Sequence, residues 1–95
     1  METDELKASL SRVREASLKV TEGNAASADQ SLKEIFRLNN VIGRLARLHP
    51  ETLPHLKALQ RDVNLITVGV KNGRRKDIDE GLALTEKAIA GLSKI

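Results

Sequence analysis

The chain has 95 residues, of which 40% are hydrophobic and 31% are charged, with a net charge of +3 and no cysteine. This length predicts a single helical domain over residues 1–95 and is too short for two domains with independent cores. The lack of cysteine excludes disulfides, thiolate catalysis and cysteine-ligated zinc. Because Phe36 is the only aromatic residue, the chain has no set of rings on which nucleic-acid bases could stack.

The charge distribution and the apolar runs indicate the location of the protein in the cell. No apolar run approaches the roughly 18 residues that a membrane-spanning helix needs. The first ten residues, METDELKASL, are acidic and mixed, unlike a signal peptide. Charges of both signs are interspersed, which is typical of solvated helix surfaces and only weakly favours nucleic acid as a partner. We therefore expect a cytoplasmic protein without a membrane span.

The first predicted helix covers residues 4–21. Its apolar stripe is narrow and contains serine, with steps that alternate between four and three residues: Leu6, Leu10, Val13, Ser17 and Val20. Such a stripe predicts a helix that is held loosely. Gly23 and Asn24 follow it, and both residue types adopt the left-handed conformation that ends a helix. Ser27 and Gln30 then form a capping-box pattern that predicts the start of a second helix.

The second predicted helix, residues 28–48, has apolar residues over more than half of its circumference. They are Leu32, Ile35, Phe36, Leu38, Val41, Ile42, Leu45, Ala46 and Leu48. One bundle interface covers a stripe somewhat wider than 100°. We therefore expect part of this helix to bind another protein or a second copy of the chain. The candidate partner-binding residues are Leu38, Val41, Leu45 and Leu48.

The segment LHPETLPHLK, residues 48–57, is a predicted corner between helices. Pro50 disfavours helical geometry at His49, and Thr52 is a good N-cap for a helix whose first turn contains Pro54. His49, Glu51 and His55 raise the alternative of a metal site. Zinc needs three or four converging ligands, and the chain has no third histidine and no cysteine. We therefore expect no metal.

The third predicted helix, residues 53–71, has the clearest seam, with steps of three and four residues: Leu56, Leu59, Val63, Ile66 and Val70. Asn72 and Gly73 are expected to close it. The fourth, residues 77–94, has Asp77 and Glu80 as a capping-box pattern. Its seam is Ile78, Leu82, Thr85, Ile89 and Leu92, with Gly81, Ala88 and Gly91 as small residues for close helix approach. The predicted fold is all-α, either a small antiparallel four-helix bundle or a pair of long helical hairpins that assemble between chains.

The sequence contains no recognisable catalytic set. KDIDEG, residues 76–81, has acidic residues beside a glycine, but its register lacks the fifth and twelfth ligands of a calcium loop. Phosphate-binding loops, nucleophile elbows and zinc-protease motifs are absent. We expect neither an enzyme nor a bound cofactor. The candidate anion-binding residues are those of one basic turn: Lys71, Arg74, Arg75 and Lys76.

These patterns favour a helical protein–protein interaction module, a structural or adaptor subunit of a larger assembly. One alternative is a small chaperone that holds and releases a secreted or aggregation-prone client on the same apolar surface. The other is a weak nucleic-acid-binding module that uses the basic turn at residues 71–76. The predicted topology weakens that second alternative, because it places this turn and Arg44 with Arg47 at opposite ends of the bundle, so they form no continuous phosphate track.

Overall fold

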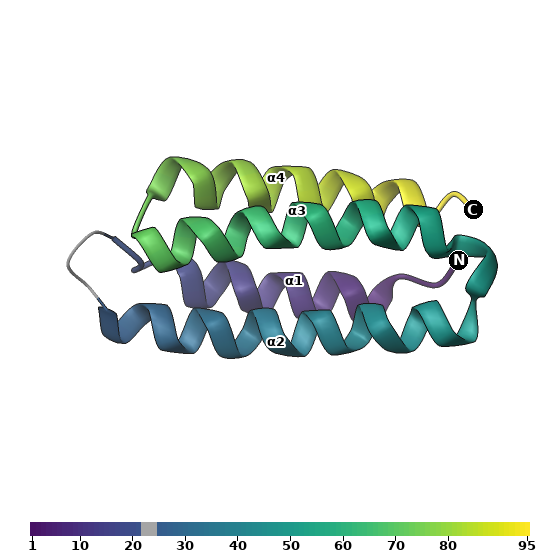
Figure 1. Ribbon diagram of the computed structural model, residues 1–95, viewed down its shortest axis with the longest axis horizontal. Coiled ribbons are helices and arrows are strands. Elements are labelled where there is room, and N and C mark those ends of the chain that lie inside the picture. The colour runs from purple at the N-terminus through teal and green to yellow at the C-terminus, as the bar shows by residue number, and fades with distance from the viewer. Residues whose placement is uncertain (22–24) are drawn as a thin grey trace.

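In the part of the chain that the structure describes, four α-helices run alternately up and down (Figure 1). The structure, a computed structural model, describes residues 1–21 and 25–95. Its elements are α1 (Asp4–Ser17), α2 (Ala25–Leu48), the short 3-10 helix η1 (Pro50–Thr52), α3 (Leu53–Asn72) and α4 (Arg75–Leu92). The bundle measures 42 × 19 × 17 Å. The predicted antiparallel four-helix bundle is therefore confirmed.

The core lies along the axis of the bundle and is built from the predicted seams. The apolar residues of the α1, α3 and α4 seams are all buried, with the serine and threonine positions Ser17 and Thr85 among them. The helix α2 adds Ile35, Leu38, Val41 and Ile42 to the same cluster. Alternating steps of three and four residues place these side chains on one face of each helix, so one core serves all four helices.

The helices pair most extensively as two hairpins, α1 with α2 and α3 with α4. Two glycines allow the α3–α4 approach. A Cβ on Gly81 would lie 2.7 Å from Ile66 Cγ1 and 2.8 Å from the Ile66 backbone nitrogen, and one on Gly69 would lie 2.8 Å from the Ile78 nitrogen. The predicted role of Gly81 is confirmed. That of Gly91 is wrong, because nothing lies within 4 Å of a Cβ placed there.

The connection between α3 and α4 follows the predicted closure. Gly73 has a φ of 63°, a left-handed conformation that glycine adopts without steric penalty. The Arg74 amide donates to the Gly69 carbonyl at 2.9 Å and the Gly73 amide to the Val70 carbonyl at 3.3 Å. These are the two backbone hydrogen bonds of a Schellman motif. The motif turns the chain directly into α4, which begins at Arg75.

Several predicted helix starts or ends differ in the structure by one to four residues. The helix α1 ends at Ser17, and Val20 reaches the core from the turn that follows. Because α4 begins two residues earlier than predicted, Asp77 lies inside its first turn and makes no side-chain capping bond. The helix α2 begins at Ala25, ahead of Ser27, and the predicted closure at residues 23–24 lies outside the described residues.

The corner between α2 and α3 is formed by η1. Pro50 opens this short helix, which separates α2 from α3 as the sequence predicts. Thr52 precedes α3 but makes no side-chain cap to it. Its hydroxyl instead donates to the His49 carbonyl at 2.7 Å. The threonine therefore stabilises the corner and not the helix that follows.

Candidate interaction surfaces

The predicted partner-binding residues of α2 do not form one exposed surface. Leu38 is fully buried and Val41 is 7% exposed, so both belong to the core of the chain's own bundle. Leu45 is partly buried and packs against the same core. Leu48, at the end of α2, is 66% exposed. The expectation that α2 leaves Leu38 and Val41 uncovered is therefore corrected.

Small side chains in α1 explain why α2 is covered so completely. Ser9 and Ser17 of α1 are fully buried, and Ser17 meets Ser31 of α2 with their hydroxyl oxygens 2.6 Å apart. Side chains of this size let two helix backbones come close. The narrow stripe of α1 therefore covers a wider arc of α2 than its few large apolar residues indicate.

A second stripe on α2 borders α3 and is only partly covered. Its members recur at steps of four and three residues: Leu32, Phe36, Asn39, Gly43 and Ala46. Asn39 marks the boundary with α3, because its side-chain oxygen accepts a hydrogen bond from Gln60 Nε2 at 2.8 Å. Phe36, one turn away, is 66% exposed, and a shallow depression of about 490 Å³ lies beside it. The only aromatic ring of the chain is thus presented to solvent.

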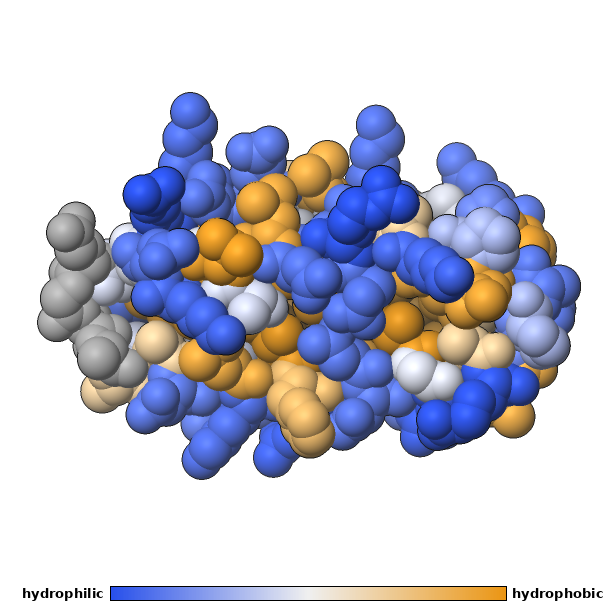
Figure 2. All heavy atoms as spheres, viewed as in Figure 1, coloured by the Kyte–Doolittle hydropathy of each residue, from blue (hydrophilic) through white to orange (hydrophobic). Residues whose placement is uncertain are grey.

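The helix α3 supplies the other side of this surface. Its residues there recur with the same spacing: Leu53, Lys57, Gln60, Asn64, Thr67 and Lys71. Leu53 is 40% exposed, and Val68, next to Thr67, is 50% exposed. Figure 2 shows orange side chains among blue ones over α2 and α3. We call the two stripes together with Val68 the α2–α3 face.

Gly43 has no packing role within the bundle. Nothing lies within 4 Å of a Cβ built on it, unlike Gly69 and Gly81, and it lies five residues before the end of α2. A glycine inside a helix destabilises it by about 0.5–1 kcal/mol relative to alanine. The spacing of seven residues places Gly43 on the same side of α2 as Phe36. The face therefore combines a projecting ring with a position that lacks a side chain.

The net charge of the protein resides in the segment that forms this face. Residues 25–72 contain seven Lys or Arg and four Asp or Glu, whereas the rest of the chain contains nine of each. Of the four acids, Glu34 is buried against arginines. Five exposed cations on the outer sides of α2 and α3 make no ion pair in the described part of the chain: Lys33, Arg47, Lys57, Arg61 and Lys71. Positive charge therefore predominates around the stripe, and one acid, Asp29, also lines the depression beside Phe36.

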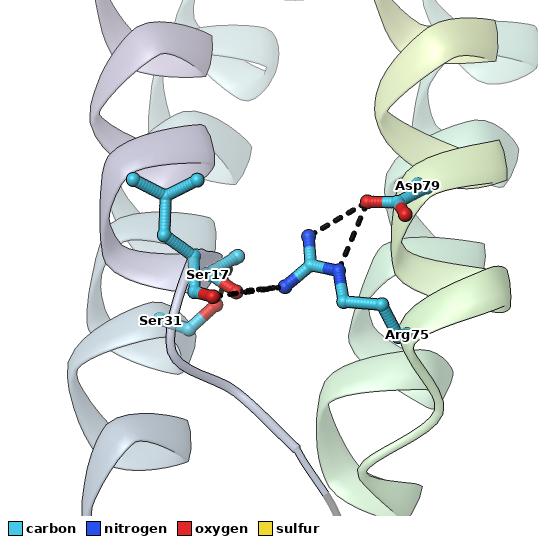
Figure 3. A network of polar contacts seen from close by, with 5 residues as sticks. Ser17, Ser31, Arg75 and Asp79 are labelled. Carbon is cyan, nitrogen blue, oxygen red and sulfur yellow. Dashed lines mark hydrogen bonds and ion pairs between the residues drawn. The ribbon is translucent and has the colours of Figure 1, made fainter.

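The candidate anion-binding turn loses one of its four residues to an internal contact (Figure 3). The Arg75 guanidinium donates two hydrogen bonds to Asp79 Oδ1, at 2.7 and 3.0 Å. It also donates to the backbone carbonyl of Ser17, beyond which α1 ends. These contacts hold the pKa of Asp79 below its usual range, mainly through the hydrogen bond from Arg75. Arg75 thus links α1 to α4.

The other three residues of the turn, Lys71, Arg74 and Lys76, are exposed. They make no ion pair or side-chain hydrogen bond among the described residues. The turn lies at the same end of the bundle as the last residues of α1, opposite the η1 corner (Figure 1). Arg44 does not extend it, since this residue pairs with Glu5 on α1. The cations of the turn therefore remain a local cluster.

The histidines of the corner do not converge. His49 Nδ1 lies 3.5 Å from Glu51 Oε1, and both side chains are largely exposed. His55 is exposed in the first turn of α3. Within residues 1–21 and 25–95, no group of three or more His, Cys, Asp or Glu residues could hold a metal ion. In that same part of the chain, no helix is long and apolar enough to cross a membrane.

A groove also follows the seam between α1 and α4, the less extensive of the two contacts between hairpins. It has a volume of about 410 Å³, a floor of Leu10 and Ile89, and a rim that includes Lys7. Arg14 on α1 forms an ion pair with Glu86 on α4, with 2.9 Å between Arg14 Nη2 and Glu86 Oε2. This ion pair neutralises the charges at its centre, so the groove presents no group that selects a ligand.

Several buried polar groups were not predicted from the sequence. Glu34 of α2 is 4% exposed, and its carboxylate lies 2.8 Å from Arg37 Nη1 and 3.5 Å from Arg12 Nε of α1. Ser9 is fully buried, and its hydroxyl has no hydrogen-bond partner among the described residues. A charged residue inside an apolar helix face is the one sequence signal that marks Glu34. For the serines of α1 the signal is their register, since Ser17 occupies a position of the predicted stripe.

Comparison with known proteins does not assign this chain to a family. No protein-family model, curated protein or solved structure matches it. The surfaces described above are therefore interpreted from their own geometry and chemistry.

Proposed function

We propose that this protein is a helical protein–protein interaction module, a structural or adaptor subunit that binds another protein along its α2–α3 face. The observation that supports this function is the exposure of Phe36. A bundle of this size can bury one phenylalanine, yet the only aromatic ring of the chain is 66% exposed. Aromatic residues, phenylalanine among them, are enriched at protein interfaces relative to the rest of the surface.

The surroundings of Phe36 also favour an interface. Single exposed apolar residues are normal on soluble proteins, but contiguous apolar surface rimmed by polar groups marks interaction sites. Leu32 and Gly43 share the stripe of Phe36, and Leu53 and Val68 are exposed on α3. The proposed surface thus replaces the one expected at Leu38 and Val41. It keeps the predicted helix and changes the side of it that binds.

A photocrosslinking amino acid at position 36 tests this function in cells of the source organism. The matched control places the same amino acid at Leu18, which is 61% exposed at the end of α1. We expect a discrete covalent adduct to a protein from position 36 and none from position 18. The proposal is wrong if position 36 gives no adduct, or if both positions give the same set.

A further inference from the structure

We infer that the partner bound by the α2–α3 face is an amphipathic helix of another protein with acidic residues flanking its apolar side. This inference rests on the proposed function and names the chemistry of the partner. Three features of the face carry it: the projecting Phe36, the open position at Gly43 and the unpaired cations of the rim.

The surface of the face suits a helix. The helices α2 and α3 pack less extensively than the helices within each hairpin, and the shallow depression beside Phe36 is lined by α2 residues, Leu32 and Lys33 among them. An amphipathic helix binds such an apolar surface with apolar residues at helical spacing. At Gly43 nothing lies within 4 Å of the missing Cβ, so another backbone or a large side chain can approach α2 there. Phe36, two turns away, would contact the same helix.

The charges of the face select an acidic partner. Lys33 and Lys71 lie toward one end of the α2–α3 face and Arg47 and Lys57 toward the other, with Arg61 between them on α3. All five are exposed and form no ion pair among the described residues. A second copy of the chain would bring a like set of cations against them, which opposes association. Acidic side chains on a foreign helix would pair with them.

Nucleic acid and anionic membranes share the negative charge but not the apolar contact. Binding to single-stranded nucleic acid uses several aromatic rings in a groove, and this chain has one. Phosphate contacts alone do not require the open position at Gly43. A helix uses the ring, the open position and the cations together, so the face favours a protein helix over either alternative.

Selection from a displayed library of amphipathic helical peptides, whose charged positions vary freely between acidic and basic, tests the inference. We expect the enriched peptides to be acidic and their affinity to fall as salt rises. Phe36→Ser should weaken binding at least about tenfold, as expected for an aromatic anchor. Gly43→Ala should weaken it about tenfold while raising Tm by roughly 4 °C, because a helix-interior glycine is removed.

Two variants serve as controls. Gly91→Ala removes another helical glycine with nothing within 4 Å of a Cβ, and Leu18→Ser removes an equally exposed apolar side chain. Both should bind the selected peptides like the unmodified chain.

Enrichment of basic or uncharged peptides, no enrichment, or unchanged binding by Gly43→Ala would overturn the inference. So would tighter binding to a DNA duplex, to phosphatidylserine vesicles or to a second copy in light scattering. A crosslink from position 36 to a protein without such a helix would leave the proposed function intact and refute the inference alone.

Discussion

At the scale of single residues, polar groups determine how the helices are joined. Arg75 donates to Asp79 within α4 and to the Ser17 carbonyl on α1. Ser17 and Ser31 share a buried hydrogen bond between α1 and α2. The end of α1 is therefore held from both sides by directional contacts, in the region where its apolar stripe has a serine in place of a large side chain.

The Arg75–Asp79 contact predicts a specific pH dependence. The folded-state pKa of Asp79 is lowered, so the contact stabilises the fold above the ordinary aspartate pKa, about 3.9, and this contribution is lost as pH falls through the folded value. In Arg75→Gln, the pKa of Asp79 should return toward the ordinary value. Titration of the side-chain carboxyl by NMR measures it. The stability difference between the two proteins should be largest near neutral pH and shrink as the pH falls below the ordinary aspartate pKa and through the lowered folded value. An unchanged pKa would show that Arg75 does not contact Asp79 in solution.

The unpaired hydroxyl of Ser9 predicts a stabilising substitution. A buried hydroxyl without a partner loses its hydrogen bonds to water, so Ser9→Ala should raise the free energy of unfolding by about 1 kcal/mol. Ser17→Ala is the matched change, because it leaves the Ser31 hydroxyl buried and unpaired and should lower that free energy by roughly 1–2 kcal/mol. Urea denaturation measures both. Effects of the same sign would contradict the assignment of these hydrogen bonds.

At the scale of elements, the two hairpins are built differently. The α3–α4 pair depends on two glycines that face isoleucines of the opposite helix, Gly69 against Ile78 and Gly81 against Ile66. The α1–α2 pair depends on small polar residues and on ion pairs, such as the one between Arg12 and Glu34. Close packing of backbones tolerates less change than a contact between side chains, so the two hairpins should respond differently to added volume.

Alanine substitutions of two glycines in α4 test how closely α3 and α4 approach, because Gly81 faces α3 and Gly91 faces open space. Gly81→Ala should lower the free energy of unfolding by about 1–3 kcal/mol, since the new methyl group would overlap the Ile66 backbone. Gly91→Ala should be neutral or stabilise by up to roughly 1 kcal/mol, because its Cβ meets open space. Thermal and urea unfolding of both variants provide the comparison. Equal effects would mean that α3 and α4 are farther apart than described.

The helices and their seams could be predicted from the sequence better than the contacts between one helix and another. Alternating steps of three and four residues identified the seams of α3 and α4, and Asn72–Gly73 identified the turn between them. The width of the apolar arc on α2 did not reveal which side stays exposed, because that depends on how closely α1 approaches. Local spacing also carries no information on contacts such as Arg75 with Ser17, which are 58 residues apart.

At the scale of the whole molecule, the net positive charge is distributed unevenly over the bundle. The middle of the chain, α2 through α3, carries the entire net positive charge, while α1 and α4 with their flanks are balanced. Because α2 and α3 pack against each other, the charge falls on one flank of the bundle. This asymmetry, together with Phe36, distinguishes the α2–α3 face from the groove between α1 and α4.

The helix α2 is divided between core and surface, and aspartate substitutions on its two sides should have opposite outcomes. Val41 is 7% exposed and lies in the shared core, so Val41→Asp would bury an unpaired carboxylate and should unfold the protein at neutral pH. Leu48 is 66% exposed, so Leu48→Asp should change the free energy of unfolding by less than about 0.5 kcal/mol. Circular dichroism and urea denaturation distinguish the two outcomes. If Val41→Asp keeps its helicity and stability, Val41 lies on a free surface and the original prediction for this residue is restored. If Leu48→Asp unfolds the chain, the end of α2 packs more tightly than the structure describes.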